Sequence, residues 1–173
     1  MPNTVHAQAP HPDGYIYIYG TQNDPLIKQL VAARVKPGHI ADFDQYEYYN
    51  GTEWTPHIED SAPLTGRVSS ELSVTPLPDG RYILVFQEDT LGQFVDVKIG
   101  NSPVGPWGQP IQIYHCPEPG MLKDVYTYNA KAHPSLSAPG ELLISYNVNT
   151  FNFLDHFNHA DIYHPRFIRL KLK

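Results

Sequence analysis

Three carboxylate side chains in the middle of the chain have the chemistry that acid–base hydrolysis requires. Glu71 precedes a run of apolar and β-branched residues, and Glu88 and Asp89 directly follow another such run. Glycoside hydrolysis needs one carboxylic acid to protonate the leaving oxygen and a second carboxylate to attack or to activate water. We therefore predict that Glu71 is catalytic and that Glu88 and Asp89 bind substrate. The structural alternative is that Glu71 bonds neighbouring backbone and that the other two form a solvated loop pair.

A second group of candidates carries aromatic, amide and imidazole side chains. Tyr126 and Tyr128 are two positions apart, so in a strand they share a face. The same spacing places Asn147 and Asn149 together. Tyrosine rings stack on the C–H faces of sugars, and amides bond sugar hydroxyls. We predict these four residues and His133 as substrate-binding, against the alternatives of ring packing, loop stabilisation and a backbone-held histidine.

Short strands that start after Pro/Gly turns must position these residues. Three aromatic or β-branched runs begin in this way, over residues 15–19, 81–87 and 141–148. Further strands are predicted over 29–35, 94–99 and 166–172, over the Trp-bearing segments 46–55 and 105–114, and over 71–75 and 133–136. Residues 26–35 also fit an amphipathic helix, but their place in the repeat favours a strand.

These strands form a four-strand unit that recurs at about 60 residues, which is typical of a β-propeller. We predict an all-β fold of four-stranded antiparallel blades, with about three blades present. Their expected limits are 15–60, 66–116 and 126–173, after a poorly structured extension over 1–14. In such a fold the candidates gather around a funnel at one face. Closed propellers have four or more blades, so open sheet edges are expected to favour self-association.

The composition limits the classes of function. The 173 residues include 17 Pro and 12 Tyr and are only 17% charged, against roughly 25% in an average domain. The net charge of −6, without a cluster of basic residues, excludes a nucleic-acid-binding surface. No apolar run approaches the ~20 residues of a membrane span, and the first residues show no signal-peptide pattern. The single Cys116 excludes an internal disulfide.

The histidines near the C-terminal end suggest a metal site at first sight. His156, His159 and His164 lie close to Asp155 and Asp161, and a HxxH spacing with nearby carboxylates is compatible with zinc. No predicted helix sets their geometry, so we expect loop histidines, with no metal and no cofactor. An ion in the central channel of a propeller stays an open alternative.

Five segments of the last two units resemble the C-terminal part of the domain of unknown function 4185 (DUF4185). They read SELSVTPL, NSPVGPWGQP, YTYNAKAHPSLS, GELLISYNVN and YHPRFIRLKL. That family consists mostly of secreted five-bladed propellers and includes endo-acting D-arabinan hydrolases. The resemblance implies a sugar-active propeller and an extracellular location. It also implies that N-terminal blades, which hold much of the acidic pair of the hydrolases, are missing from this chain.

Two classes of function follow from these patterns. In the first, the chain is part of a glycoside-hydrolase-like propeller that acts on or binds a polysaccharide such as arabinan by carboxylate acid–base chemistry. In the second, it is a non-catalytic carbohydrate-binding or assembly module, or a truncated domain without independent activity. The sequence leaves open whether the chain is an enzyme.

Overall fold

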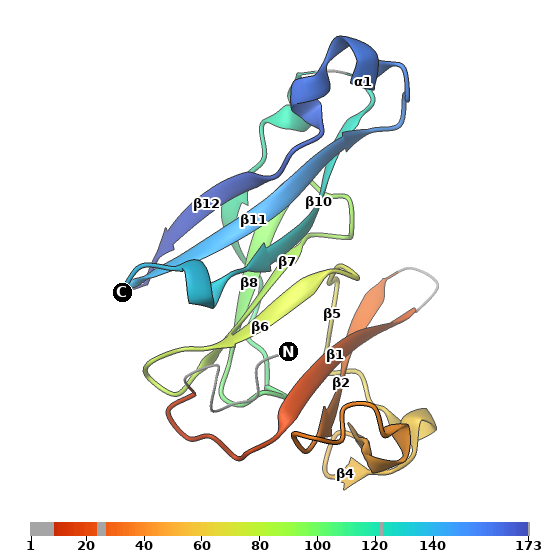
Figure 1. Cartoon of the computed structure of the whole chain (residues 1–173), viewed down its shortest axis with the longest axis vertical. Helices are drawn as coiled ribbons and strands as arrows, with labels where there is room; N and C mark the ends of the chain where they lie inside the picture. Colours follow the sequence, from red (N-terminus) through yellow and green to blue (C-terminus); the bar gives the residue numbers. More distant parts are fainter. Residues whose placement is uncertain (1–8, 24–26, 122, 173) are drawn as a thin grey trace. The chain divides into compact units, whose positions relative to one another are not determined.

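The computed structural model describes residues 9–23, 27–121 and 123–172 of the chain (Figure 1). Within these ranges the strands form three antiparallel sheets, and the helical segments are short. They are α1 (Asp155–Asn158) and the 3-10 turns Phe43–Gln45, Ile58–Asp60, Glu118–Gly120, Pro134–Leu136 and Ala160–Ile162. The predicted all-β class with antiparallel sheets is therefore confirmed. Of the predicted N-terminal extension, residues 1–8 lie outside the described part, and 9–14 contain no helix or strand.

The first sheet is built on a long hairpin. Its strands follow the order β1 (Ile16–Asn23), β2 (Lys28–Val35), β3 (Glu47–Tyr49) and β4 (Trp54–Thr55), and β5 (Thr65–Gly66) also pairs with β2. The register runs from Ile16 opposite Val35 to Asn23 opposite Lys28. Residues 28–35 are thus a strand, as their place in the repeat predicts, whereas Leu26 lies outside the described residues. Leu30 and Val35 are completely buried, which anchors β2 in the core.

The second sheet contains four consecutive strands in chain order, as predicted. They are β6 (Leu72–Pro76), β7 (Tyr82–Gln87), β8 (Phe94–Gly100) and β9 (Ile111–His115). Its two middle strands are almost entirely buried, and Leu84, Val85 and Val95 are fully enclosed. The chain divides into two compact units whose limits cross this sheet. One contains the described residues up to Gly66 with 74–83 and 99–109, and the other contains 67–73, 84–98 and the described residues from Pro110 onward.

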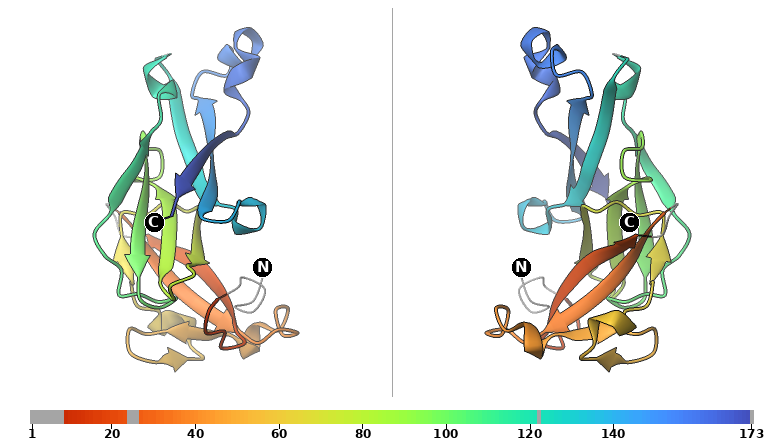
Figure 2. Two further views of the ribbon diagram at one scale, coloured as in Figure 1. Left: turned by 90° about the vertical axis from the view of Figure 1, so that its left-hand side faces the viewer. Right: turned by 90° about the vertical axis from the view of Figure 1, so that its right-hand side faces the viewer.

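The third sheet corrects one predicted strand. It consists of β10 (Val125–Ala132), β11 (Glu141–Thr150) and β12 (Arg166–Lys171), side by side in Figure 1. The prediction of a strand over 133–136 was wrong, because Pro134 has no N–H to donate and begins a 3-10 turn. The Ser137 hydroxyl closes this turn by donating to the His133 carbonyl and accepting the Leu143 N–H, both at 2.8 Å. Figure 2 shows this turn at one end of the sheet and α1 at the other.

A tight contact in the second sheet's connection gives a test of packing. A Cβ atom on Gly100 would lie 2.8 Å from Cε3 of Trp107, closer than packed carbons approach. We expect Gly100→Ala to lower the free energy of unfolding by about 1–3 kcal/mol, because overpacking displaces the indole. Urea denaturation measures this change.

Gly120→Ala is the matched control, since a Cβ there meets nothing within 4 Å. Equal unfolding free energies for the two variants would show that the Trp107 side chain moves aside without loss of stability.

Candidate functional site

The pairing of β10 with β11 gathers most of the predicted binding residues on one face. Tyr126 lies opposite Asn149, and Tyr128 lies opposite Asn147, so all four side chains share that face. The predicted face-sharing within each pair is thus confirmed. The His133 ring joins them, because its Nε2 lies 2.7 Å from the hydroxyl of Ser145, two residues before Asn147 on β11. Burial lowers the pKa of His133, with a smaller contribution from a neighbouring lysine.

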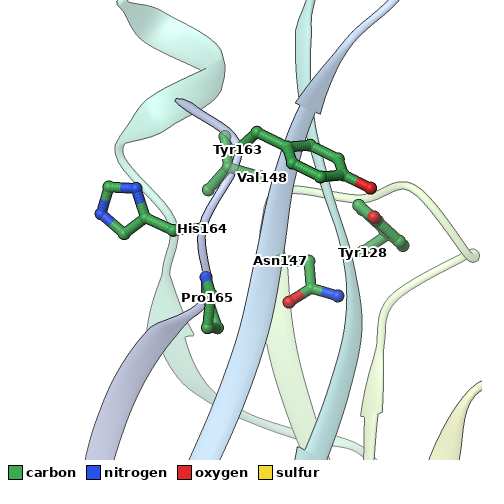
Figure 3. Close-up of a pocket in the computed structure, with 6 residues that line it drawn as sticks. All are labelled: Tyr128, Asn147, Val148, Tyr163, His164 and Pro165. Atoms are coloured by element: carbon green, nitrogen blue, oxygen red, sulfur yellow. The ribbon is translucent and has the colours of Figure 1, made fainter. Parts of the chain in front are cut away.

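A cavity of about 210 Å³ opens on this face (Figure 3). We call it the aromatic–amide pocket, and its lining residues are Tyr128, Asn147, Val148, Tyr163, His164 and Pro165. Figure 3 shows the Tyr163 ring lying across β11 with its hydroxyl directed toward Tyr128, whereas His164 points to the opposite side. The Asn147 amide lies beside Tyr128, below the Tyr163 ring in this view, and forms no hydrogen bond with any described residue. The pocket therefore offers two phenols and a free amide to a ligand.

An aromatic cluster extends this pocket along the sheet. Tyr126 lies 5.7 Å from Tyr128 and stacks on Phe151 at 4.3 Å, measured between ring centroids. Burial, followed by the phenols of Tyr128 and Tyr163, raises the pKa of Tyr126. Its hydroxyl thus stays protonated at neutral pH and remains a hydrogen-bond donor. Sequence reasoning missed Phe151 and Tyr163, and the aromatic run FNFLDHF directly after β11 was a usable signal for Phe151.

Asn149 stabilises a loop, which was the structural alternative to substrate binding. Its Oδ1 accepts the N–H of Thr150 at 2.8 Å and lies 3.0 Å from Nε2 of His156. This amide therefore holds the segment after β11, while the equivalent amide of Asn147 faces the pocket. The two asparagines have different environments despite their shared face.

The predicted acidic residues form a second cluster around Arg67. The Arg67 guanidinium donates to Glu88 at 2.8 Å and to both carboxylate oxygens of Asp89 at 3.2 and 2.7 Å. The turn before β6 and the turn after β7 therefore meet, as the repeat predicts. Glu71 lies in the turn before β6 and its side chain is exposed, but no described residue forms a hydrogen bond or ion pair with its carboxylate. The structure thus joins Glu88 to Asp89 but does not join Glu71 to either.

The two turns that meet in this cluster contain residues with an unusual backbone conformation. Arg67, Asp89 and Thr90 have φ angles of 59°, 47° and 77°, in the left-handed region that residues other than glycine rarely adopt. Such residues cost on the order of 1–3 kcal/mol each and concentrate at functional sites. The bidentate Arg67–Asp89 pair helps to hold both turns in place.

Sequence reasoning missed two buried ionisable residues on β8, Asp96 and Lys98. Asp96 is 5% exposed, and its Oδ1 has no partner among the described residues. Burial, followed by the charge of Glu88, raises the pKa of Asp96, and Arg67 offsets only part of this effect. Burial also lowers the pKa of Lys98, which lies two residues further along the same face. The usable signal was the alternation FVDVKI, which places two charges on one side of an otherwise apolar strand.

A buried ion pair anchors the loop that carries Tyr163. Glu118 is 7% exposed and accepts the Tyr146 hydroxyl with both oxygens at 3.1 Å and the Arg166 Nε at 3.2 Å. Arg166 also donates to the carbonyls of Asp161 and His164, each at 3.0 Å. A cavity of about 240 Å³ lies beside this network. Because the polar groups of the network already bond one another, we assign it a structural role.

Two further classes of site were tested in the described ranges. No group of three or more His, Cys, Asp or Glu side chains there is arranged to hold a metal ion, including the histidines of residues 156–164. None of the helices in those ranges is long and apolar enough to cross a lipid bilayer.

The comparisons with known proteins place this all-β chain in a family. The model of the family described as Domain of unknown function (DUF5005) matches residues 4–172, so the chain belongs to that family. A solved structure of a "putative hydrolase" from Bacteroides ovatus ATCC 8483 is similar, with a TM-score of 0.72 and 29% identity over 91% of this chain. The match covers 42% of that protein, so the chain spans less than half its length. No curated protein matches. The relationship to DUF4185 stays a prediction.

The buried carboxyl of β8 gives a prediction with a definite sign. Because the folded-state pKa of Asp96 is raised, ionisation of this group destabilises the fold as pH rises through that pKa. We expect Asp96→Asn to increase the free energy of unfolding at pH 7, and we expect this advantage to shrink at pH 4, where protonation of Asp96 in the folded state removes most of the cost of its burial. Urea denaturation at pH 4 and pH 7 measures the difference.

Asp79→Asn provides a control of opposite sign, because the hydrogen bond from Arg81 lowers the pKa of Asp79. A loss of stability at pH 7 in Asp96→Asn would mean that the ionised carboxylate is favoured in the fold.

Proposed function

We propose that the chain forms part of a glycoside-hydrolase-like β-propeller and binds a polysaccharide through the aromatic–amide pocket. The observation that carries this proposal is the convergence of Tyr128, Asn147 and Tyr163 around one open cavity. A sugar ring offers C–H faces for the two phenyl rings and hydroxyls for the amide and phenol groups. Such mixed pockets, with few convergent polar groups among apolar ones, are typical of ligand sites.

The propeller architecture is supported by the order of the strands within each sheet. The second sheet follows the sequence β6-β7-β8-β9, and the third follows β10-β11-β12, each as an antiparallel meander. Propeller blades are built in this way. The coverage of 42% of a longer hydrolase-like protein accords with a ring that is incomplete in this chain. We therefore take the three sheets as blades, with further blades supplied elsewhere.

Hydrolysis is a second candidate function, favoured by the carboxylates around Arg67 and by the likeness to a hydrolase. In this function the exposed Glu71 is the catalytic carboxylate, and Glu88 and Asp89 contact substrate. Both of the latter are ion-paired to Arg67. Binding is the better supported of the two functions, because the aromatic and amide groups converge on one cavity, whereas no measured distance among the described residues places a second carboxylate at the separation from Glu71 that hydrolysis requires. Arabinan as the substrate and an extracellular location rest on the DUF4185 resemblance.

The pocket can be tested by binding to soluble arabinan. We expect Tyr163→Ala and Asn147→Ala each to weaken the affinity about fivefold or more, as the loss of about 1 kcal/mol from a stacking or hydrogen-bonding partner requires. Isothermal titration calorimetry measures the affinities. Phe43→Ala is the control, because it removes an aromatic ring that is 74% exposed in the other compact unit.

Wild-type affinity in both pocket variants would remove the pocket from the proposal. Reducing-sugar release from arabinan, abolished by Glu71→Gln, would instead establish hydrolysis by this chain. Binding of arabinan without release of reducing sugar supports a non-catalytic carbohydrate-binding module.

A further inference from the structure

Both ring nitrogens of His156 face oxygen atoms. Nε2 lies 3.0 Å from Oδ1 of Asn149, and Nδ1 lies 3.1 Å from the backbone carbonyl oxygen of Phe153. A carbonyl oxygen only accepts hydrogen bonds, so Nδ1 must carry the proton in the second contact.

Nε2 of His156 must likewise donate the hydrogen bond in its contact with Asn149. The Asn149 amide atom that faces His156 also faces the backbone N–H of Thr150 at 2.8 Å. Because a backbone N–H only donates, the atom between them is the amide oxygen, and Nε2 must donate to it as well. A neutral imidazole carries one N–H, whereas an imidazolium carries two. Only the doubly protonated ring makes both hydrogen bonds.

We propose that His156, in its doubly protonated form, is a positioning residue that fastens the segment 151–163 to β11 and so holds Tyr163 in the aromatic–amide pocket. This inference rests on the proposed function of that pocket and adds a pH dependence to it. The His156 ring meets Tyr163 edge to face, with the centroids 5.6 Å apart and the planes at 72°. It also contacts the Phe153 ring, with a centroid distance of 5.7 Å. One imidazolium therefore joins a strand, a loop carbonyl and the pocket tyrosine.

The segment needs such a link because it buries little apolar surface of its own. Five of its six large apolar side chains are 65–74% exposed, namely Phe151, Phe153, Leu154, Phe157 and Tyr163, and Ile162 is the buried one. Segments with few buried contacts open at low free-energy cost, so a few polar contacts decide whether they stay in place. Further links come from three hydrogen bonds. Asp155 accepts the Thr150 hydroxyl at 2.9 Å, the Phe151 N–H donates to the Asp124 carbonyl at 2.9 Å, and Arg166 donates to the Asp161 carbonyl at 3.0 Å.

The charges around His156 are compatible with this role. From β11 it is faced by the neutral Asn149 and Thr150. Its own helix and the following turn contribute the described groups Asp155, His159, Asp161 and Tyr163. Two of these are carboxylates, and residues 155–163 contain no lysine or arginine. The charged ring makes both hydrogen bonds and a neutral ring makes only one, so fastening is strongest at low pH and weakens as pH rises through the range in which histidines lose their proton, between about pH 5 and 8.

Limited proteolysis with chymotrypsin measures the fastening without any ligand. The five exposed apolar residues of the segment are cleavage sites, and the equally exposed Phe43 provides an internal reference for the protease's own pH dependence. In the wild-type chain we expect cleavage within 151–163, relative to cleavage after Phe43, to rise about threefold or more from pH 5.5 to pH 8. His156→Gln should give the high ratio at both values.

His159→Gln is the matched control, since it makes the same substitution in the same segment at a ring with no hydrogen bond to described residues. It should retain the wild-type pH response. A wild-type ratio that is constant with pH, or a response that survives in His156→Gln, overturns the inference. If His156→Gln does not fold, nitrogen-15 NMR of the histidine-labelled wild type decides: a His156 ring with a single protonated nitrogen at pH 5.5 overturns the inference.

The affinity for soluble arabinan, measured at the same two pH values, separates this inference from the proposed function. Weaker binding at pH 8 in the wild type, but not in His156→Gln, supports both. A pH-dependent cleavage ratio without any arabinan binding supports the fastening by His156 and contradicts the proposed ligand.

Discussion

The arrangement of the candidate site depends on the register between β10 and β11. Strand side chains alternate between faces, so a slip of one residue would move Tyr128 and Asn147 to opposite faces. The buried residues on the other face prevent such a slip, because Val125, Thr127 and Val148 would be forced toward solvent. The hydrophobic face thus determines the position of the polar one. The pocket follows from this constraint more than from any local preference of its lining residues.

The same sheet is secured at its ends by polar contacts of unequal strength. On one side, Glu118 binds Tyr146 and Arg166 in a buried network in which every partner is satisfied. On the other side, the segment after β11 is held by Asn149, His156 and a few side-chain contacts at the surface. Charged hydrogen bonds inside a protein are stronger than those exposed to water. The sheet is therefore held more strongly than the segment 151–163 that follows β11, and this segment is the more easily displaced part.

Much of the framework could be predicted from the sequence, and the reasons differ between elements. The strands that begin after Pro/Gly turns, such as β7 and β11, were identified because their residue types and their flanking turns agree. The strand predicted over 133–136 lies too late in the chain. This segment, like 71–75, precedes a Pro/Gly turn and a strand, but Pro134 starts a 3-10 turn and the strand is Val125–Ala132. Tyr163 could not be found locally, since its position depends on Arg166 reaching a carboxylate 48 residues earlier. Asp96 was overlooked because burial of a charge depends on tertiary packing, not on strand pattern alone.

The Glu118–Arg166 pair also bears on the order in which this part of the chain can fold. The carboxylate belongs to the segment before β10, and its only described cationic partner lies at the start of β12. A chain that emerges from the ribosome with β10 and β11 alone would have to bury this carboxylate without a cation, which is unfavourable. Burial of Glu118 against β10 and β11 is therefore favoured once β12 has brought Arg166 into place.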